Sequence, residues 1–345
     1  MRRFELFVGL RYLTSRKRHG FVSFITWISI LGVTTGVMAM VVVLSVMTGL
    51  QKDLREKILG TNAHLVVLRS GGAIEDYDAI RAQIREVGGD EIVGTTPFIY
   101  NQAMLTTEAN VMGVVIRGVD LDSVTTVTRL AEYVVEGSLD ALTAPVPDPL
   151  DSDGLALPGI LLGKELALNL GLYVGDEVNV VSPTGNIGPM GVAPKMKRFR
   201  VAGIFSSGMY EYDSGLVYVS LHDAQLFFGT GDRVTGIEIR VRHPQHADLT
   251  GLAIQETLGF PFYARDWKEL NRNLFSALQL EKFGMGLILI LIITVAAFNI
   301  VSTLFMVVLQ KGREIAILKS MGATNGSIQR IFMLEGLIVG VVGAG

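Results

Sequence analysis

The chain of 345 residues contains no cysteine, and only 18% of its residues are charged. Without cysteine the protein has no disulfide, no zinc site built on thiolates and no thiol nucleophile. A typical soluble domain carries about 25% charged residues, and the mean hydropathy of this chain is +0.43. The composition therefore excludes a soluble cytosolic enzyme.

Charge is missing altogether from two long stretches. The 32 residues Gly20–Gln51 and the 28 residues Phe283–Gln310 contain no Asp, Glu, Lys or Arg. At a rise of about 1.5 Å per residue, each stretch could cross a hydrocarbon core of roughly 30 Å. We predict transmembrane helices over residues 21–47 and 283–309. The first stretch is too long for the apolar part of a cleavable signal peptide, so we expect an uncleaved anchor.

Apolar side chains continue beyond both stretches at a spacing of four residues: Val46, Leu50, Leu54 and Ile58 after the first, and Leu270, Leu274 and Leu278 before the second. Such a stripe marks a helix face that must be buried. We predict stalk helices over residues 48–62 and 266–282. Helices that pack on their own domain are the alternative.

The charges that are present are unevenly distributed. Residues 1–20 have a net charge of +5, residues 52–282 of −10 and residues 311–345 of +2. The positive-inside rule therefore predicts a cytoplasmic amphipathic segment at 1–20, a cytoplasmic coupling helix at 310–326 and a long segment outside between the spans. Residues 327–345 are expected to begin a third transmembrane helix that the chain end truncates. A short re-entrant segment is the alternative.

The outer segment has the pattern of an α+β domain, which we place at residues 63–265. Period-two alternation predicts strands at Ala63–Arg69, Glu91–Tyr100, Gln102–Thr107, Val111–Val119, Arg198–Ser206, Gly236–Val241 and Phe260–Ala264, and wider periodicity predicts helices at Tyr77–Val87 and Gln245–Leu258. Gly159–Val181 predicts a short helix followed by a strand. Asp140–Pro158 contains four prolines and four aspartates and predicts a loop. A small inserted β-rich subdomain is predicted at about 137–206.

No set of residues suited to catalysis is evident. His243 and His246 have the spacing of metal ligands, but Pro244 lies between them and no third ligand is near. The segment 159–165 has three residues between its glycines and ends in Glu165, whereas a phosphate loop needs four residues and a final Ser or Thr. We predict no catalytic residue, no metal and no cofactor in this chain. The absence of ionisable residues from both spans argues against a secondary transporter or channel.

The segment after the second span predicts a short amphipathic helix over Arg313–Met321. Gly322 is suited to the position after its end, and Thr324 or Asn325 can cap the next helix. A short rigid helix on the cytoplasmic face is suited to docking a partner. The predicted coupling residues are Arg313, Glu314, Ile317, Lys319, Met321 and Gly322.

The segment Ser182–Lys197 predicts a long loop between two antiparallel strands, Glu177–Val181 and Arg198–Phe205. It is far longer than a usual hairpin connection, and it combines three prolines with apolar side chains. An exposed apolar loop is usually a binding element; a disordered insertion is the alternative. The predicted binding residues are Pro183, Ile187, Pro189, Met190, Val192 and Pro194.

These motifs resemble a known family. REIAILKSMGAT at 313–324 resembles the ATPase-contacting element of FtsX-type permease domains in transporters of the MacB architecture. Residues 4–60, 97–120 and 159–183 resemble the LolC/LolE family, the transmembrane subunits of the lipoprotein-releasing complex of Gram-negative inner membranes. Members of that family have four membrane helices, whereas this chain ends within the third predicted one.

The resemblance implies a MacB-like membrane protein that passes triacylated lipoproteins from the outer leaflet of the bacterial inner membrane to a LolA-like periplasmic chaperone. It implies a separate LolD-like ATPase that binds ATP and Mg, a second LolC/LolE-type subunit, and a hook at 182–197 that holds the chaperone; nucleic acid is not an expected partner. Acyl chains are expected near the outer ends of the spans, although the residues there could simply face bilayer or a neighbouring helix. These residues are Met40, Val43, Met47, Phe283 and Met285.

Two rival functions remain open at this point. The first is a relative of the same architecture, a MacB-type efflux subunit or an FtsX-type subunit that transmits a mechanical signal. The second is a membrane-anchored envelope scaffold or enzyme. Co-purification of an ATPase would separate the second rival from the permease interpretation.

Overall fold

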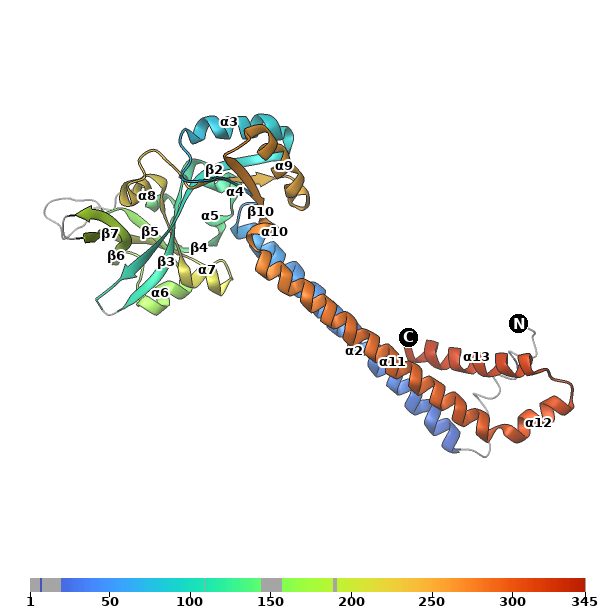
Figure 1. Cartoon of the computed structure of the whole chain (residues 1–345). Helices are drawn as coiled ribbons and strands as arrows, with labels where there is room; N and C mark the ends of the chain where they lie inside the picture. The colour runs from blue at the N-terminus through green and yellow to red at the C-terminus, as the bar shows by residue number, and fades with distance from the viewer. Residues whose placement is uncertain (1–6, 8–19, 109, 144–156, 189–190, 345) are drawn as a thin grey trace. The chain divides into compact units, whose positions relative to one another are not determined.

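The computed structural model describes residue 7 and residues 20–108, 110–143, 157–188 and 191–344. The chain folds into two compact units (Figure 1), which we call the helical unit, residues 1–52 and 273–345, and the sheet domain, residues 53–272. Most of the predicted N-terminal segment at 1–20 and most of the predicted loop at 140–158 lie outside the described residues.

The helical unit is built on two long helices, α2 (Gly20–Thr61) and α11 (Arg272–Gln310), both of which continue past the boundary of the unit. Within the described residues, two helical stretches are long and apolar enough to cross a membrane, Ile30–Thr61 and Arg272–Gln310. The shorter helices α12 (Gly312–Ser320) and α13 (Asn325–Ala344) follow.

Glycines lie where these helices pack against each other. A Cβ atom added to Gly36 of α2 would lie 3.3 Å from Cγ2 of Ile292 on α11. A Cβ atom added to Gly336 of α13 would lie 3.0 Å from Cδ1 of Leu304, also on α11. Small residues allow the close backbone approach that holds apolar helices together in a membrane.

The described residues of the sheet domain form ten strands: β1 (Leu65–Arg69), β2 (Ile92–Thr106), β3 (Val111–Val119), β4 (Val134–Gly137), β5 (Gly159–Gly163), β6 (Glu177–Gly188), β7 (Gly191–Phe205), β8 (Leu216–Ser220), β9 (Gly236–Val241) and β10 (Phe262–Asp266). Its α-helices are α3 (Tyr77–Gly88), α4 (Leu121–Val127), α5 (Leu130–Tyr133), α6 (Lys164–Leu170), α7 (Tyr210–Gly215), α8 (Leu221–Phe228), α9 (Ala247–Leu258) and α10 (Trp267–Leu270). Short 3₁₀ turns lie at Gly89–Glu91, Asp140–Leu142 and Pro244–His246.

All ten strands belong to one mixed sheet in the order β10-β1-β9-β2-β3-β8-β5-β7-β4, and β6 pairs with both β2 and β7. The long strand β2 lies in the middle of the sheet and links its two halves. Phe98 of β2 is paired with Gly236 of β9 on one side and with Val119 of β3 on the other. β3 and β8 are parallel, as are β5 and β7, and the remaining pairs are antiparallel.

The sheet buries apolar side chains beneath short helices. Phe199 on β7 packs edge-on against Phe227 of α8, with ring centroids 6.2 Å apart, and Phe205 packs against Tyr218 at 5.1 Å. All four rings are buried. Such contacts stabilise the packing of the amphipathic helices on the sheet, because burial of each aromatic ring removes a large apolar area from water.

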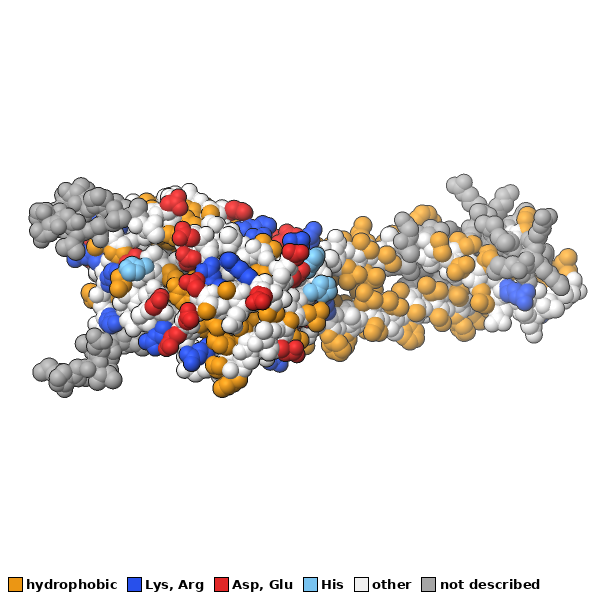
Figure 2. Space-filling view, turned by 90° about the horizontal axis from the view of Figure 1, so that it is seen from above, with side chains coloured by type: hydrophobic (Ala, Val, Ile, Leu, Met, Phe, Trp, Pro, Cys, Tyr) orange, Lys and Arg blue, Asp and Glu red, His pale blue; other side chains and the backbone are white. Residues whose placement is uncertain are grey.

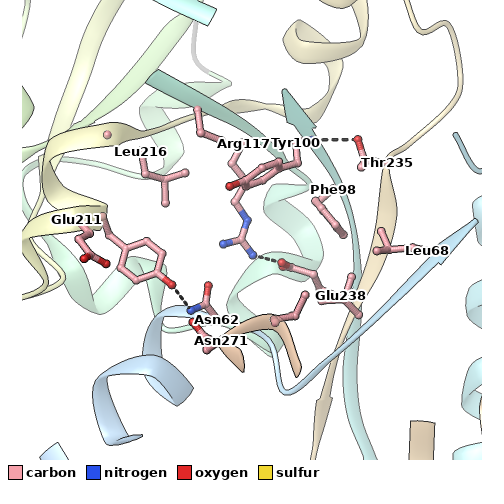
Figure 3. Close-up of a pocket in the computed structure, with 15 residues that line it drawn as sticks. Asn62, Leu68, Phe98, Tyr100, Arg117, Glu211, Leu216, Thr235, Glu238 and Asn271 are labelled. Carbon is pink, nitrogen blue, oxygen red and sulfur yellow. Dashed lines mark hydrogen bonds and ion pairs between the residues drawn. The ribbon is translucent and has the colours of Figure 1, made fainter. Parts of the chain in front are cut away.

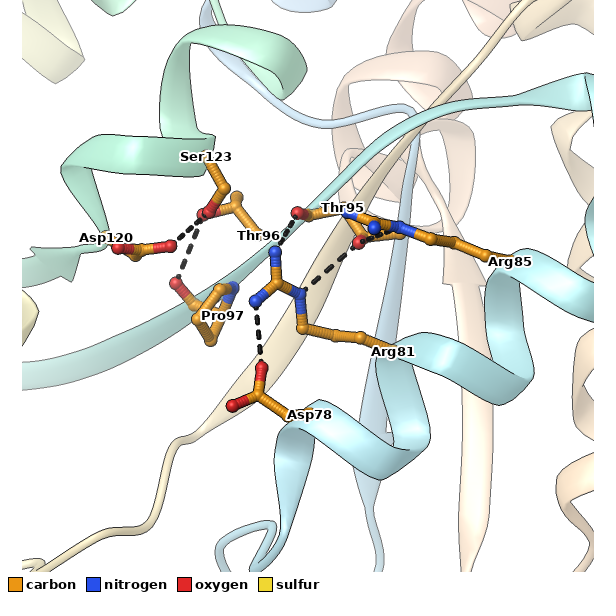
Figure 4. A network of polar contacts seen from close by, with 8 residues as sticks. All are labelled: Asp78, Arg81, Arg85, Thr95, Thr96, Pro97, Asp120 and Ser123. Atoms are coloured by element: carbon orange, nitrogen blue, oxygen red, sulfur yellow. Dashed lines mark hydrogen bonds and ion pairs between the residues drawn. The ribbon is translucent and has the colours of Figure 1, made fainter.

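Polar contacts fix two further helices to β2 (Figure 4). Arg81 of α3 donates to the carbonyl oxygen of Thr95 at 2.9 Å, and Arg85 donates to the Thr95 hydroxyl at 3.2 Å. On α4, the Ser123 hydroxyl donates to Oγ1 of Thr96 at 2.8 Å. Adjacent residues of one strand thus hold two helices.

The structure confirms several predicted elements and corrects others. Val111–Val119 and Gly236–Val241 are strands β3 and β9 as predicted, whereas the two strands predicted between residues 91 and 107 are the single strand β2. The segment 137–206, predicted as an inserted subdomain, contributes β5, β6 and β7, which hydrogen-bond to β8 and β2 in the common sheet.

The predicted loop at Ser182–Lys197 is wrong for most of its length. β6 runs to Gly188 and β7 begins at Gly191, with Gly188 paired to Gly191. Cross-strand pairing satisfies backbone groups that a long loop would leave to water. Pro183 and Pro194 lie where this pairing is interrupted, between Ser182 opposite Lys195 and Asn186 opposite Ala193, and proline is tolerated at such irregularities.

The predicted stalk helix at 266–282 is interrupted. α10 ends at Leu270, and α11 begins only after Asn271, whose φ and ψ are −108° and 30°. The Asn271 side chain donates to the carbonyl oxygen of Trp267 at 2.8 Å. The backbone amide of Asn271 donates to the same oxygen at 3.3 Å, so the last carbonyls of α10 are satisfied although the helix stops there.

Candidate functional site

Three places in the molecule are candidates for function: the short helix α12, the β6–β7 ribbon, and a cavity in the sheet domain. α12 carries the predicted coupling residues in an open position. The side chains of Ile317 and Met321 are 53% and 80% exposed. Lys311 pairs with Glu314 at 2.9 Å, which fixes the first turn of the helix. Apolar side chains are thus exposed beside a paired charge, as a docking surface requires.

The end of α12 is fixed by backbone geometry. Gly322 has φ of +93°, a value that side chains of L-residues rarely allow. The Gly322 amide donates to the carbonyl oxygen of Lys319 at 3.0 Å, and the Ala323 amide donates to that of Leu318 at 3.0 Å. Oγ1 of Thr324 then accepts from the Ser327 amide at 3.3 Å and caps α13. The predicted helix, its glycine and its threonine cap are confirmed as structure, and their role in coupling stays a prediction.

The β6–β7 ribbon extends beyond the part of each strand that pairs with the rest of the sheet. β6 pairs with β2 only over Asn179–Val181, and β7 pairs with β5 only from Arg200 onward. Beyond these points the two strands pair with each other alone, from Ser182 opposite Lys195 to Gly188 opposite Gly191. We call residues 182–197 the ribbon tip. Its described pairing is interrupted between Ser182 opposite Lys195 and Asn186 opposite Ala193.

The predicted hook residues are only partly described. The side chains of Pro183 and Pro194 are exposed. Ile187 lies opposite Val192 in the register, but the side chains of residues 184–193 and the backbone of Pro189 and Met190 lie outside the described part of the structure.

The five residues predicted to contact lipid differ in exposure. On α2, Met40 is half-buried, Val43 is 51% exposed and Met47 is buried at 9%. On α11, Phe283 is 72% exposed and Met285 is half-buried. Because Met47 is buried, the five residues do not form one uniform exposed patch.

The cavity was not predicted from the sequence. It has a volume of about 590 Å³ and lies within the sheet domain (Figure 3). Its polar wall contains Arg117 of β3 and Glu238 of β9, which form a buried ion pair across β2. On the other side of the cavity the Asn62 amide donates to the Tyr212 hydroxyl at 2.8 Å.

Burial and charge set the ionisation of this pair. Burial alone would lower the pKa of Arg117, but the neighbouring carboxylate of Glu238 outweighs it and raises that pKa above its ordinary value. Burial raises the pKa of the adjacent Tyr218 to about 12. Arg117 therefore stays charged and Tyr218 stays neutral at physiological pH. Nε of Arg117 and Oε2 of Glu238 have no hydrogen-bond partner within the described residues.

A signal for Arg117 exists in the sequence. In the alternating strand Val111–Val119, Arg117 occupies the same face as Val115 and Val119, where an apolar residue is expected. Glu238 gives no such signal, because it shares the polar face of β9 with Gly236 and Arg240 while Ile237, Ile239 and Val241 form the apolar face. Only the topology shows that the two strands lie close together and that Glu238 is buried.

No metal or catalytic cluster emerges elsewhere in the described ranges. No group of three or more His, Asp or Glu side chains there could hold a metal ion. His243 contacts the Glu91 carboxylate at 3.0 Å, which lowers the pKa of Glu91.

Comparison with known proteins identifies two family models along the chain. The MacB-like periplasmic core domain matches residues 26–257, and the FtsX-like permease C-terminal domain matches residues 286–345.

Two curated relatives align with almost the whole chain. The lipoprotein-releasing system transmembrane protein LolC of Neisseria meningitidis serogroup B is 37% identical over 98% of this chain and 79% of its own length. The LolC protein of Xylella fastidiosa (strain Temecula1) is 37% identical over 97% of this chain and 78% of its own length. Among solved structures, the periplasmic region of MacB from Actinobacillus actinomycetemcomitans is 11% identical, covering 63% of this chain and 94% of that one with a TM-score of 0.36.

Proposed function

This chain belongs to the LolC family of lipoprotein-releasing transmembrane proteins, and we propose that it is the permease subunit of a transporter that releases lipoproteins from the bacterial inner membrane. The observation that carries the proposal is the 37% identity over 98% of the chain with a LolC protein. In this proposal the released lipoprotein passes to a soluble LolA-like chaperone.

ATP hydrolysis is assigned to a separate LolD-like subunit. Its docking site is α12, where Ile317 and Met321 are exposed and the glycine at 322 fixes the turn into α13. Arg313, Glu314 and Lys319 supply charges beside this apolar surface. Because α12 is a short helix held at both ends, a movement of the bound ATPase would displace α11 and α13. A flexible loop in the same place would deform instead. ATP and Mg then bind the partner, and this chain contributes no catalytic residue.

We propose that α12 lies in the cytoplasm and the sheet domain in the periplasm. Support comes from the charge of +5 over residues 1–20, as against −10 over residues 52–282. The N-terminus is cytoplasmic, and α13 is the start of a further membrane segment. A second LolC/LolE-type subunit is proposed to complete the membrane part of the complex. Val43 and Phe283 are candidate contacts for acyl chains, since both are exposed on the membrane helices.

The ribbon tip is proposed to hold the chaperone. It projects from the sheet as a two-stranded element, and its apolar residues Ile187, Met190 and Val192 would suit a partner with a lipid-binding groove. Burying three apolar side chains contributes roughly 1.5–3 kcal/mol each before ordering costs are subtracted.

The experiment is a calorimetric titration of the periplasmic chaperone against the purified complex with and without Asn186–Val192. We expect the deletion to weaken binding strongly while the ATPase still co-purifies. A matched control replaces Leu249 and Leu252 with serine, because both are exposed apolar residues on α9 of the same domain, outside the ribbon.

Unchanged chaperone affinity in the deletion would remove the ribbon tip from the proposal. Absence of any ATPase from the purified native complex would remove the permease assignment itself. The two results are independent, so each part of the proposal can fail alone.

A further inference from the structure

The last turn of α2 lies against a short turn that directly follows strand β7. β7 ends at Phe205, and we call residues 206–209 the β7 turn. A Cβ atom added to Gly208 in this turn would lie 3.8 Å from Cε of Lys57, which belongs to the end of α2. The two elements are therefore in van der Waals contact, although they are far apart in the sequence.

A hydrogen bond links the end of α2 to the same turn through α7. The side-chain amide of Asn62 donates to the Tyr212 hydroxyl at 2.8 Å (Figure 3). The backbone amide of Asn62 donates to the carbonyl oxygen of Ile58 at 2.9 Å, so Asn62 is fixed to the last turn of α2. Beside Tyr212, the buried carboxylate of Asp213 accepts from the amide and the hydroxyl of Ser207 at 2.8 and 2.7 Å. Hydrogen bonds to an ionised group are strong, so α7 is held firmly to the β7 turn.

A further set of contacts runs through α5. The backbone amide of Arg129 donates to the carbonyl oxygen of Gly60 at 3.2 Å, and a Cβ atom added to Gly60 would clash with the Tyr133 hydroxyl. The carbonyl oxygen of Tyr133 accepts from the amide of Ser206 at 2.8 Å. The end of α2 thus contacts the β7 turn directly, through α5 and through α7.

Strand β7 connects this turn to the ribbon tip. It runs without a break from Gly191 to Phe205, so its first residues belong to the ribbon tip and the β7 turn follows its last residue. Between these ends β7 pairs with β5 from Arg200 onward, and Phe199 and Phe205 are buried in the core. Because packed protein interiors have low compressibility and transmit strain, a displacement of the β7 turn shifts β7 with it.

We propose that the contact between the end of α2 and the β7 turn regulates the ribbon tip, so that a change in this contact alters the affinity of the ribbon tip for its partner. Asn62 and Tyr212 are positioning residues, since neither lies in the ribbon tip. The proposal rests on the proposed function for the partner, a lipid-carrying chaperone, and for the source of movement, an ATPase bound at α12. The contacts between α2, the β7 turn and β7 belong to the sheet domain alone.

The variants remove one hydrogen bond and keep the packing. Tyr212→Phe retains the ring, which packs against the core, and loses the bond to Asn62. Asn62→Ala removes the same bond from the other side. Tyr210→Phe is the matched control, because Tyr210 lies on the same helix and is 67% exposed.

The first measurement is a titration of the purified complex with the chaperone, without nucleotide and with ATP and vanadate. We expect the two states of the wild type and of Tyr210→Phe to differ in chaperone affinity by about fivefold or more, a usual size for coupling between sites. Tyr212→Phe and Asn62→Ala should reduce this ratio to about twofold or less while the rate of ATP hydrolysis is unchanged. A wild-type ratio in both variants, or a wild-type affinity that does not depend on nucleotide, would overturn the proposal.

The second measurement needs no partner. Amide hydrogen exchange of the full chain in detergent should become about threefold faster in the β7 turn and in residues 195–205 of Tyr212→Phe, because a hydrogen bond that holds this region is lost, and β1 and β9 should be unaffected. Faster exchange confined to α7, equal acceleration in β1 and β9, or no change would refute the linkage. If the exchange pattern is found but the wild type binds no chaperone, the proposed function fails and the linkage between α2 and β7 remains.

Discussion

The helical unit and the sheet domain use the same apolar residue types in opposite ways. In the helical unit, Val43 and Phe298 are 51% and 68% exposed, whereas in the sheet domain Leu65 and Phe199 are at most 1% exposed. Figure 2 shows the result, with hydrophobic side chains over the surface of the long helices and charged side chains over the domain. Burial from water therefore stabilises the sheet domain, while lipid removes that driving force between membrane helices.

Polar side chains differ in the same way. Thr34, Thr48 and Thr294 of the helical unit donate to carbonyl oxygens one turn earlier in their own helices, at 2.7–2.9 Å. In the sheet domain, buried polar groups find partners far away in sequence, as Arg117 and Glu238 do. A helix in lipid must satisfy its groups locally, whereas a folded sheet can bring distant residues together. The comparison predicts that buried ionic contacts matter most in the domain and that backbone geometry matters most in the helices.

The strongest test is to break the buried ion pair. Arg117→Met leaves Glu238 charged and unpaired, which should cost about 3–5 kcal/mol. The buried Trp267 reports on the domain, because Trp27 is the only other tryptophan and can be changed to Phe. Urea unfolding of the full chain followed by Trp267 fluorescence should show the loss. Arg117→Met with Glu238→Leu should recover most of it, since no charge is then left unpaired.

The same ion pair shows which features of the fold can be predicted from the sequence and which cannot. Alternation identified β3 and β9; in β9, Ile237, Ile239 and Val241 alternate with Gly236, Glu238 and Arg240, although the strand is buried on both faces. It missed β5 and β8, whose residues are buried on both faces and therefore do not alternate. Arg117 departs from the pattern of its strand, but Glu238 does not, and the separation of 121 residues between them hides their contact.

The functional elements were predicted unevenly for a related reason. α12 with Gly322 was predicted from the local rules of helix ends, which act over a few residues. The ribbon was predicted as a loop, because prolines and glycines argue locally against strands while cross-strand pairing decides their actual structure. The cavity could not be predicted at all, since residues from five separate strands line it.

A second prediction tests packing between the membrane helices. Gly36→Leu should destabilise the helical unit by about 1–3 kcal/mol through overpacking, because a Cβ atom there already lies 3.3 Å from Ile292. Gly284→Leu is the control, since a Cβ atom at Gly284 meets nothing within 4 Å. Thermal unfolding in detergent measures both variants. Equal midpoints for the two would mean that glycine packing does not hold α2 and α11 together.

A third prediction concerns the turn after α12. Gly322→Ala forces a side chain into φ of +93° and should cost about 1 kcal/mol. Gly326→Ala on α13 has no positive φ and no nearby atom, so it should be neutral. In the proposed function, Gly322→Ala also weakens the dependence of ATP hydrolysis on lipoprotein. Wild-type stimulation of the ATPase in that variant would show that the turn is not required for coupling.

The smallest expected effect is a pH dependence that belongs to the sheet domain alone. His64 is buried, with Nδ1 3.0 Å from the carbonyl oxygen of Val241. Burial, with a smaller contribution from the charge of Arg240, lowers the pKa of His64 below its ordinary value of 6.5. The unfolded chain therefore binds a proton before the folded chain does, and stability is complete above pH 6.5 and falls as the pH drops below it. Urea unfolding read from Trp267 between pH 7.5 and 5 should show this fall. His64→Gln should remove it, and His243→Gln, which alters an exposed histidine, should not. A wild-type slope that persists in His64→Gln would assign the titration to another group.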